Sequence, residues 1–137
     1  MTVLAFGLIL LLGLLDWNSL DWPAGWRWSV GLTLILIGNG LAWSGVWQLG
    51  WKPTWGAQDK LITKGLYTYT RNPQYLGDML ILVGWAILSA SGLTMVAVLL
   101  GLIAFALAPF AEEPWLEENY GSAYRHYKDT APRFIGI

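Results

Sequence analysis

The stretch LITKGLYTYTRNPQYLG, residues 61–77, separates two apolar halves of the chain. It is polar, basic and aromatic, and it leads directly into a long apolar segment. A second charged cluster, Glu112 and Glu113, ends the apolar segment that follows. A membrane protein this small is not expected to keep two such clusters at the same water boundary without a use for them. The two clusters therefore indicate a ligand site at one boundary between apolar segments and water.

The composition is typical of a membrane protein. Of 137 residues, 55% are hydrophobic and only 12% are charged, whereas soluble domains average about 25% charged residues. The length permits one domain, residues 1–137. The chain has no Cys and only His126 as a histidine, so we expect no metal site. A net charge of −1 argues against nucleic-acid binding.

Four apolar segments predict the fold class. A membrane-spanning helix needs roughly 17–25 residues. Residues 28–47 and 93–110 are long enough, residues 75–90 qualify if their helix begins near Asn72, and residues 1–15 are short. We expect an all-α integral-membrane bundle of about four transmembrane helices. Two of them fall within residues 1–50, and residues 60–137 form the ligand-binding core.

The basic residues predict the orientation in the membrane. Seven of the eight follow the second and fourth apolar segments, at Lys52, Lys60, Lys64 and Arg71, and at Arg125, Lys128 and Arg133, whereas only Arg27 lies in the first loop. Because cytoplasmic loops carry an excess of Lys and Arg, we expect both termini and the ligand site to be cytoplasmic.

Local signals predict where the helices begin and pack. Asn72 and Pro73 are typical of a helix start, with Asn as the cap and Pro at the first position. The turn at residues 89–92 predicts an antiparallel hairpin of the third and fourth helices. Ala97, Gly101, Ala104 and Ala108 share one face of the fourth helix. We expect another helix to pack closely against that face.

Residues 112–128 predict a C-terminal cytoplasmic amphipathic helix. Leu116, Tyr120, Tyr124 and Tyr127 recur in it at helical spacing. This aromatic face is suited either to resting on lipid headgroups or to covering a pocket.

Several side chains near the boundary are candidates for chemistry. Glu112 is placed to bind hydroxyl or amino groups of a ligand, or to pair with Arg71. Asp78, about two turns into the third helix, is a functional candidate or a carboxylate favoured by the helix dipole. Tyr67 and Tyr75 lie close to Arg71 in the sequence, as interfacial anchors or as aromatic contacts for a cationic ligand.

Three motifs together resemble a known family. They are L-[IV]-T-x-G-x-Y-x-x-x-R-[HN]-P-x-Y-x-G, then E-E-x-x-L-x-x-x-[FY]-G-x-x-Y-x-x-Y, and a closing P-R-F-I, matched here by residues 61–77, 112–127 and 132–135. This combination resembles the isoprenylcysteine carboxyl methyltransferase family, which includes phospholipid methyltransferases. The resemblance covers the C-terminal 55–60% of the chain, roughly, because residues 1–50 match only as generic spanning helices.

The resemblance implies a membrane methyltransferase that uses S-adenosylmethionine. The acceptor would be a small lipophilic molecule at the cytoplasmic face, an isoprenylcysteine carboxylate or another lipid. Arg71 would orient the reactants, and Asp78 is the second catalytic candidate. Carried over by position, the cofactor contacts would be Lys60, Leu61, Ile62, Tyr67, Asn72, Pro73, Gln74, Tyr75 and Glu112.

Two positions depart from the family pattern. Asn72 stands where the family usually has His, which removes a protonatable group but keeps a donor and an acceptor. Ala108 stands where eukaryotic members carry an Arg near the substrate carboxylate. The second departure argues against isoprenylcysteine as the acceptor.

Two other functions stay open at the level of sequence. Residues 72–78 partly fit the N-x-Y-x-G-[DE] pattern of NADPH-dependent, sterol-reductase-like membrane enzymes. A non-catalytic membrane module, whose motifs serve only packing at the interface, is the third interpretation. The expected partners are membrane lipids and a lipophilic substrate, and the sequence does not indicate an oligomeric state.

Overall fold

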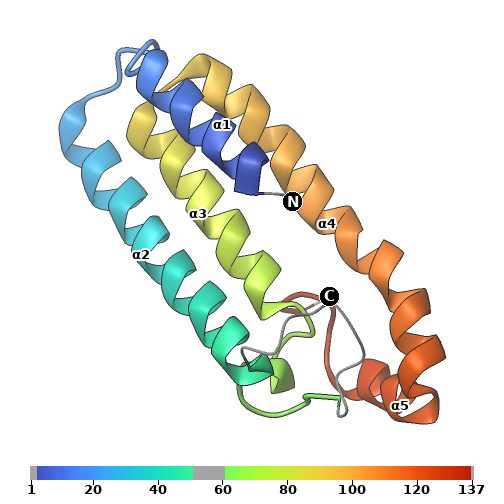
Figure 1. Ribbon diagram of the computed structural model, residues 1–137. Coiled ribbons are helices and arrows are strands. Elements are labelled where there is room, and N and C mark those ends of the chain that lie inside the picture. The colour runs from blue at the N-terminus through green and yellow to red at the C-terminus, as the bar shows by residue number, and fades with distance from the viewer. Residues whose placement is uncertain (1–2, 51–60, 137) are drawn as a thin grey trace.

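The computed structural model describes residues 3–50 and 61–136. Within these ranges all regular secondary structure is helical, as predicted, and there is no strand. The elements are α1 (Val3–Leu15), α2 (Ala24–Leu49), the 3-10 helix η1 (Gly65–Thr68), α3 (Pro73–Ser89), α4 (Gly92–Tyr120) and α5 (Ser122–Thr130). Figure 1 shows α2, α3 and α4 running along the molecule, α1 flanking only one half, and α5 at the other end.

Two helices are long and apolar enough to cross a membrane, α2 with 26 residues and α4 with 29. The other two helices of the bundle are shorter, because α1 has 13 residues and α3 has 17. A 17-residue helix is at the lower limit for spanning the hydrocarbon core. The structure therefore supports two of the four expected spans by length and composition.

Helices α2 and α3 pack backbone against backbone. A Cβ atom added to Gly38 would lie 2.6 Å from the carbonyl oxygen of Gly77, and one added to Gly84 would lie 2.7 Å from that of Gly31. Side chains larger than hydrogen would push the two helices apart at these crossings. Glycine at these four positions therefore makes the close approach of α2 and α3 possible.

The predicted small-residue face of α4 is wrong at Ala104, whereas Ala97 and Ala108 are half-buried and Ala97 packs against the core. Gly101 is buried, but Ala104 is exposed. The buried face carries Val98 and Phe105 instead, and the Phe105 ring lies 6.5 Å from that of Phe6 in α1. The contact face of α4 therefore combines large side chains with Gly101 and Ala97.

The turn between α3 and α4 is as short as predicted. Helix α3 ends at Ser89, and Ala90 adopts a left-handed conformation with φ of 46°. The Ser91 hydroxyl then accepts a hydrogen bond from the backbone N–H of Thr94 at 3.0 Å. This bond caps the first turn of α4 and keeps the helical hairpin tight.

The start of α3 differs in one respect from the prediction. Pro73 occupies the first turn, as expected, but the Asn72 side chain makes no capping bond. Its Nδ2 instead donates to the carbonyl oxygen of Arg133 at 3.0 Å. The tertiary contact with the C-terminal segment takes the amide away from the helix end.

The predicted helix over residues 112–128 has different bounds. Helix α4 continues through Pro109 and Pro114 as far as Tyr120, and α5 begins only at Ser122. Each proline lacks one N–H donor, but that loss did not end the helix. The break falls at Gly121, whose φ of 56° is readily available only to glycine.

Candidate functional site

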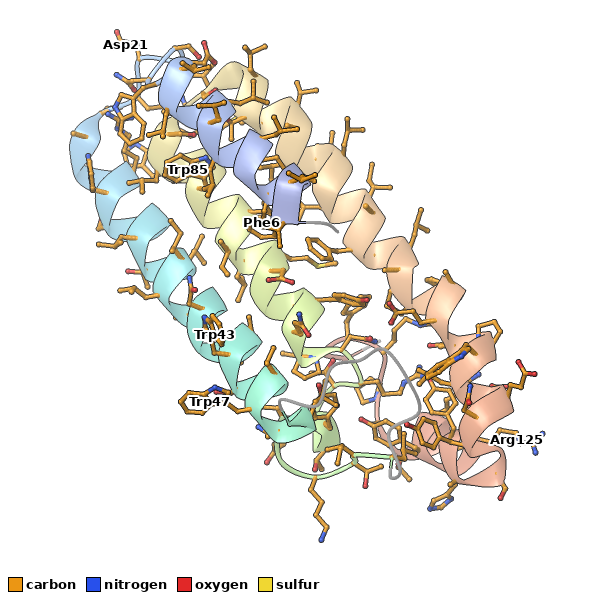
Figure 2. All side chains as sticks on the ribbon, viewed as in Figure 1. Phe6, Asp21, Trp43, Trp47, Trp85 and Arg125 are labelled. Carbon is orange, nitrogen blue, oxygen red and sulfur yellow. The ribbon has the colours of Figure 1, made fainter. Side chains whose placement is uncertain are left out.

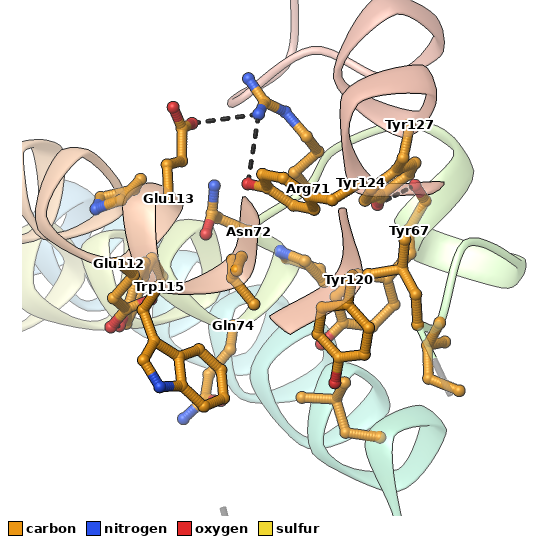
Figure 3. Close-up of a pocket in the computed structure, with 17 residues that line it drawn as sticks. Tyr67, Arg71, Asn72, Gln74, Glu112, Glu113, Trp115, Tyr120, Tyr124 and Tyr127 are labelled. Carbon is orange, nitrogen blue, oxygen red and sulfur yellow. Dashed lines mark hydrogen bonds and ion pairs between the residues drawn. The ribbon is translucent and has the colours of Figure 1, made fainter. Parts of the chain in front are cut away.

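A cavity of about 590 Å³ lies at the end of the bundle where α2 ends and α3 begins. Figure 3 shows residues from α3, α4, α5 and the segment before α3 around it. Its walls are largely aromatic and aliphatic, with charged groups on one side. The lining consists of Leu49, Leu61, Ile62, Tyr67, Arg71, Asn72, Pro73, Gln74, Tyr75, Pro109, Glu112, Glu113, Trp115, Leu116, Tyr120, Tyr124 and Tyr127.

Most of the residues predicted from sequence come together in this cavity. Arg71 lines it, and Lys60 lies outside the described residues. Asp78 is not part of the lining; it lies one helical turn along α3 from Tyr75. The predicted cofactor contacts found in the lining are Leu61, Ile62, Tyr67, Asn72, Pro73, Gln74, Tyr75 and Glu112.

Tyr75 and Glu112 join α3 to α4 at the cavity wall. They are 37 positions apart in the chain, and the Tyr75 hydroxyl donates a hydrogen bond to the Glu112 carboxylate. The Tyr75 ring also packs against Phe105 of α4, with 5.5 Å between ring centres. The two motif regions therefore meet in space. Glu112 does not pair with Arg71, however; the next residue, Glu113, does.

Glu113 is a carboxylate surrounded by basic side chains. It is only 8% exposed, and the Arg71 Nη1 lies 3.0 Å from its Oε1. Arg133 donates from Nε and Nη2 to the two carboxylate oxygens, each at 2.8 Å. Lys128 Nζ lies 3.8 Å from Oε2. A bidentate arginine pair of this kind fixes both partners in orientation, which holds Arg71 at the cavity wall.

Sequence reasoning gave Glu113 no role, although a signal for it exists. Phe105, Pro109 and Glu113 follow one another at intervals of four residues, and all three are buried. Residues four apart share one face of a helix. The buried face of α4 therefore extends past its apolar part, and Glu113, rather than Glu112, continues it.

Three tyrosines form the floor of the site. Tyr67, Tyr124 and Tyr127 are buried together with Ala131, and the Tyr127 hydroxyl donates to the Tyr67 carbonyl oxygen at 2.6 Å. Burial raises the pKa of Tyr127 to about 12, so it remains a donor at neutral pH. The face of α5 that carries Tyr124 and Tyr127 thus packs on the protein and covers the cavity.

The C-terminal segment holds the segment before α3 in place. The backbone N–H of Arg71 donates to the Pro132 carbonyl oxygen at 2.9 Å. Thr70 Oγ1 and Asn72 Nδ2 both donate to the Arg133 carbonyl oxygen at 3.0 Å. All three stretches of the sequence motif therefore meet at one end of the bundle.

Fold and site together define a class of protein. It is a helical protein with membrane-length helices and a polar, aromatic cavity at one end, of a size that suits a small organic ligand. No group of three or more His, Asp and Glu residues that could hold a metal ion occurs in residues 3–50 or 61–136.

Comparison with known proteins places the chain more narrowly. The phospholipid methyltransferase family profile matches residues 26–123. The human phosphatidylethanolamine N-methyltransferase is 31% identical over 109 residues, which cover 75% of this chain and 54% of that protein. The Aspergillus flavus phosphatidylethanolamine N-methyltransferase is 24% identical over 123 residues, 80% of this chain and 13% of that protein. No solved structure matches.

The chain belongs to the phospholipid methyltransferase family. This confirms the family resemblance predicted from the motifs in residues 61–77, 112–127 and 132–135. The chain spans about half the length of its human relative and a much smaller part of its fungal relatives.

Proposed function

We propose that the chain is a membrane enzyme that transfers a methyl group from S-adenosylmethionine to a lipid. The observation that carries the proposal is the single cavity into which Tyr75 and Glu112 converge from separate motifs. Membership of the phospholipid methyltransferase family supports the same reaction. The cavity would then lie at the cytoplasmic face, because Arg71, Lys128 and Arg133 gather around Glu113 at that end of the bundle.

The lining fits the proposed cofactor in size and chemistry. A volume of about 590 Å³ lies within the range of roughly 300–1,000 Å³ that is usual for ligand sites. The ring faces of Tyr67 and Tyr75 suit a sulfonium cation, and Asn72 and Glu112 offer polar contacts. When bound, S-adenosylmethionine supplies an activated methyl group. The chain supplies position, which can account for much of the rate in an in-line displacement.

The proposed acceptor is the amine headgroup of a phospholipid. Its support is the printed name of the relatives, which are phosphatidylethanolamine N-methyltransferases. Ala108, where an arginine would be expected beside a substrate carboxylate, is against an isoprenylcysteine acceptor. An ammonium group must lose a proton before its nitrogen can attack, so a proton acceptor is needed nearby. Asp78, one turn along α3 from Tyr75, is the proposed proton acceptor, and Arg71 the group that orients the reactants.

Labelling tests this function directly. Membranes containing the chain are incubated with S-adenosylmethionine labelled in its methyl group, and the lipid extract is analysed by mass spectrometry. We expect label in the amine headgroup of a phospholipid. Calorimetry on the purified protein separates the alternatives. NADPH binding without S-adenosylmethionine binding would favour a reductase, and binding of neither would favour a non-catalytic module.

A further inference from the structure

Tyr124 occupies a place in the cavity that the proposed function leaves without a role. It lies on α5, is only 3% exposed, and lines the cavity. Its ring packs edge-on against Tyr127, with 6.3 Å between ring centres. A phenol buried at this level needs a partner for its hydroxyl group.

The Tyr124 oxygen has a partner, which is Arg71. The Arg71 Nη1 donates to the Tyr124 oxygen at 3.4 Å, and the same nitrogen forms the ion pair with Glu113 at 3.0 Å. Figure 3 shows both interactions as dashed lines from one guanidinium group. Arg133 in turn holds Glu113 through two hydrogen bonds. The chain of contacts Arg133–Glu113–Arg71–Tyr124 therefore fixes where the hydroxyl lies.

The Tyr124 hydroxyl proton has no hydrogen-bond acceptor in the described part of the chain. Its oxygen accepts from Arg71, and no group in residues 3–50 or 61–136 accepts its own hydrogen. Burial raises the pKa of Tyr124, so the group stays protonated at neutral pH and can donate. A hydroxyl that accepts from a cation is also a stronger donor, because hydrogen bonds in a chain polarise one another.

The cation that contacts this hydroxyl is the Arg71 guanidinium, at 3.4 Å. The ion-pair network behind it joins Arg71, Lys128 and Arg133 to Glu113 and Glu117, and Glu112 is a further carboxylate of the cavity lining. An anionic oxygen of a ligand at the Tyr124 hydroxyl would accept the free proton and lie beside the guanidinium.

We infer that Tyr124 is a ligand-binding residue that donates its hydroxyl proton to an anionic oxygen of the bound molecule, with Arg71 and Glu113 as positioning residues. The inference rests on the proposed function, which provides two sources of such an oxygen. One is the carboxylate of the amino-acid end of S-adenosylmethionine, and the other is the phosphodiester of the lipid acceptor.

Binding and kinetics of Tyr124→Phe test the inference and separate the two sources. The full chain in lipid nanodiscs is titrated by calorimetry with S-adenosylhomocysteine and with its decarboxylated analogue. A hydrogen bond to a charged group is worth about tenfold or more in affinity. If the carboxylate is the partner, Tyr124→Phe weakens S-adenosylhomocysteine binding by about tenfold and leaves the analogue unchanged. If the phosphodiester is the partner, the affinities for S-adenosylhomocysteine and for its analogue are unchanged, and the KM for the phospholipid rises by about tenfold.

The positioning role of Glu113 has its own readout. Glu113→Gln should weaken the same affinity or raise the same KM as Tyr124→Phe does. The double variant should differ from either single variant by less than about twofold, because both substitutions act through one contact. Tyr69→Phe is the matched control, since Tyr69 is 72% exposed and lies outside the lining. A merely structural effect would weaken S-adenosylhomocysteine and its analogue equally.

Two results would overturn the inference in distinguishable ways. If Tyr124→Phe changes neither affinity nor KM by more than twofold, or changes both ligands equally, the inference fails and the proposed function stands. If the wild-type chain does not bind S-adenosylhomocysteine and methylates no lipid, the proposed function fails and the inference fails with it.

Discussion

Glu112 and Glu113 are neighbours in the sequence but face different partners. Glu112 is exposed and accepts from Tyr75, whereas Glu113 is buried and is paired with Arg71 and Arg133. Successive residues on a helix point about a quarter of a turn apart. Both residues line the cavity, but Glu112 remains exposed whereas Glu113 is buried among basic side chains.

Glu112→Gln tests whether the exposed carboxylate contacts the cofactor. Glutamine keeps the shape and can still accept from Tyr75, but it has no charge. We expect S-adenosylhomocysteine affinity to fall by about tenfold in calorimetry, as for the loss of a charged hydrogen bond.

Asp78→Asn is the matched comparison for that variant. Asp78 lies outside the lining, so cofactor affinity should change by less than about twofold. Turnover should fall by about 100-fold or more if Asp78 takes the amine proton. Unchanged turnover in Asp78→Asn would remove Asp78 from the mechanism.

Asp16 gives a residue-scale prediction about pH. It lies in the loop after α1, and hydrogen bonds from Ser91, Ser19 and the Leu93 N–H hold its pKa below the ordinary value. A lowered pKa means that the stabilisation is present above the ordinary value. It is lost as the pH falls below about 4 and through the folded-state pKa. Thermal unfolding in detergent should show this as a midpoint that drops on acidification.

The control for Asp16 lies in the same loop. Asp16→Asn should lower the unfolding midpoint at pH 7 and remove part of the decline that the wild type shows as the pH falls below about 4. Asp21→Asn should do neither, because no side-chain hydrogen bond joins Asp21 to residues 3–50 or 61–136. Equal behaviour of the two variants would show that the hydrogen bonds to Asp16 do not contribute to stability.

At the scale of elements, the contact between α2 and α3 depends on the absence of side chains. The two helices make the most extensive contact in the described part of the bundle. Composition does not reveal this, because the chain has 16 glycines and only some of them lie at crossings. The pattern becomes visible only when Gly38 and Gly77 are seen opposite one another.

Gly38→Ala should destabilise the bundle. The added methyl group would lie 2.6 Å from the Gly77 carbonyl oxygen, so the helices must shift. Overpacking of this kind costs about 1–3 kcal/mol, which chemical or thermal unfolding in detergent can measure.

Gly40→Ala is the control two residues away on α2. A methyl group there meets nothing within 4 Å, and alanine favours the helix by up to about 1 kcal/mol over glycine. The expected effects therefore have opposite signs. A similar loss in both variants would mean that the crossing at Gly38 is not tight.

At the scale of the whole molecule, the cavity depends on segments far apart in the chain. Asn72 is 61 positions from Arg133, and the Asn72 side chain donates a hydrogen bond to the Arg133 carbonyl oxygen. The same carbonyl oxygen accepts from Thr70. The cavity wall before α3 is thus held by the C-terminal segment, residues 131–135, as well as by its own helix.

Asn72→Ala should loosen both segments at once. Losing one neutral hydrogen bond costs about 1 kcal/mol, which corresponds to roughly fivefold in an equilibrium. We expect faster hydrogen–deuterium exchange in residues 70–72 and 131–135 and weaker S-adenosylhomocysteine binding.

Asn72→His should retain most of the function of this contact. Histidine can also donate to the Arg133 carbonyl oxygen, and the family usually has it at this position. If Asn72→Ala exchanges no faster than the wild type, the C-terminal segment is held by other contacts.

The sequence by itself determined the all-helical class, the turn at residues 89–92 and the family. Apolar run length, breaker residues and motif spacing are properties of neighbouring positions, and so they can be read without coordinates. The same local patterns also predicted about half of the cavity lining, since residues 61–77 contribute seven of its members besides Arg71. It missed Tyr124, Tyr127 and Glu113 as members of the site.

Only the tertiary structure decided which carboxylate holds Arg71, which glycines let helices touch, and where α4 ends. The first two depend on which face each helix turns toward its neighbour, and a shift of one residue rotates that face by about 100°. The third depends on Gly121 rather than on Pro114, because a helix can lose one N–H bond to proline but ends where the backbone takes a positive φ. The first two are contacts between distant positions, and local pattern carries no information about their pairing.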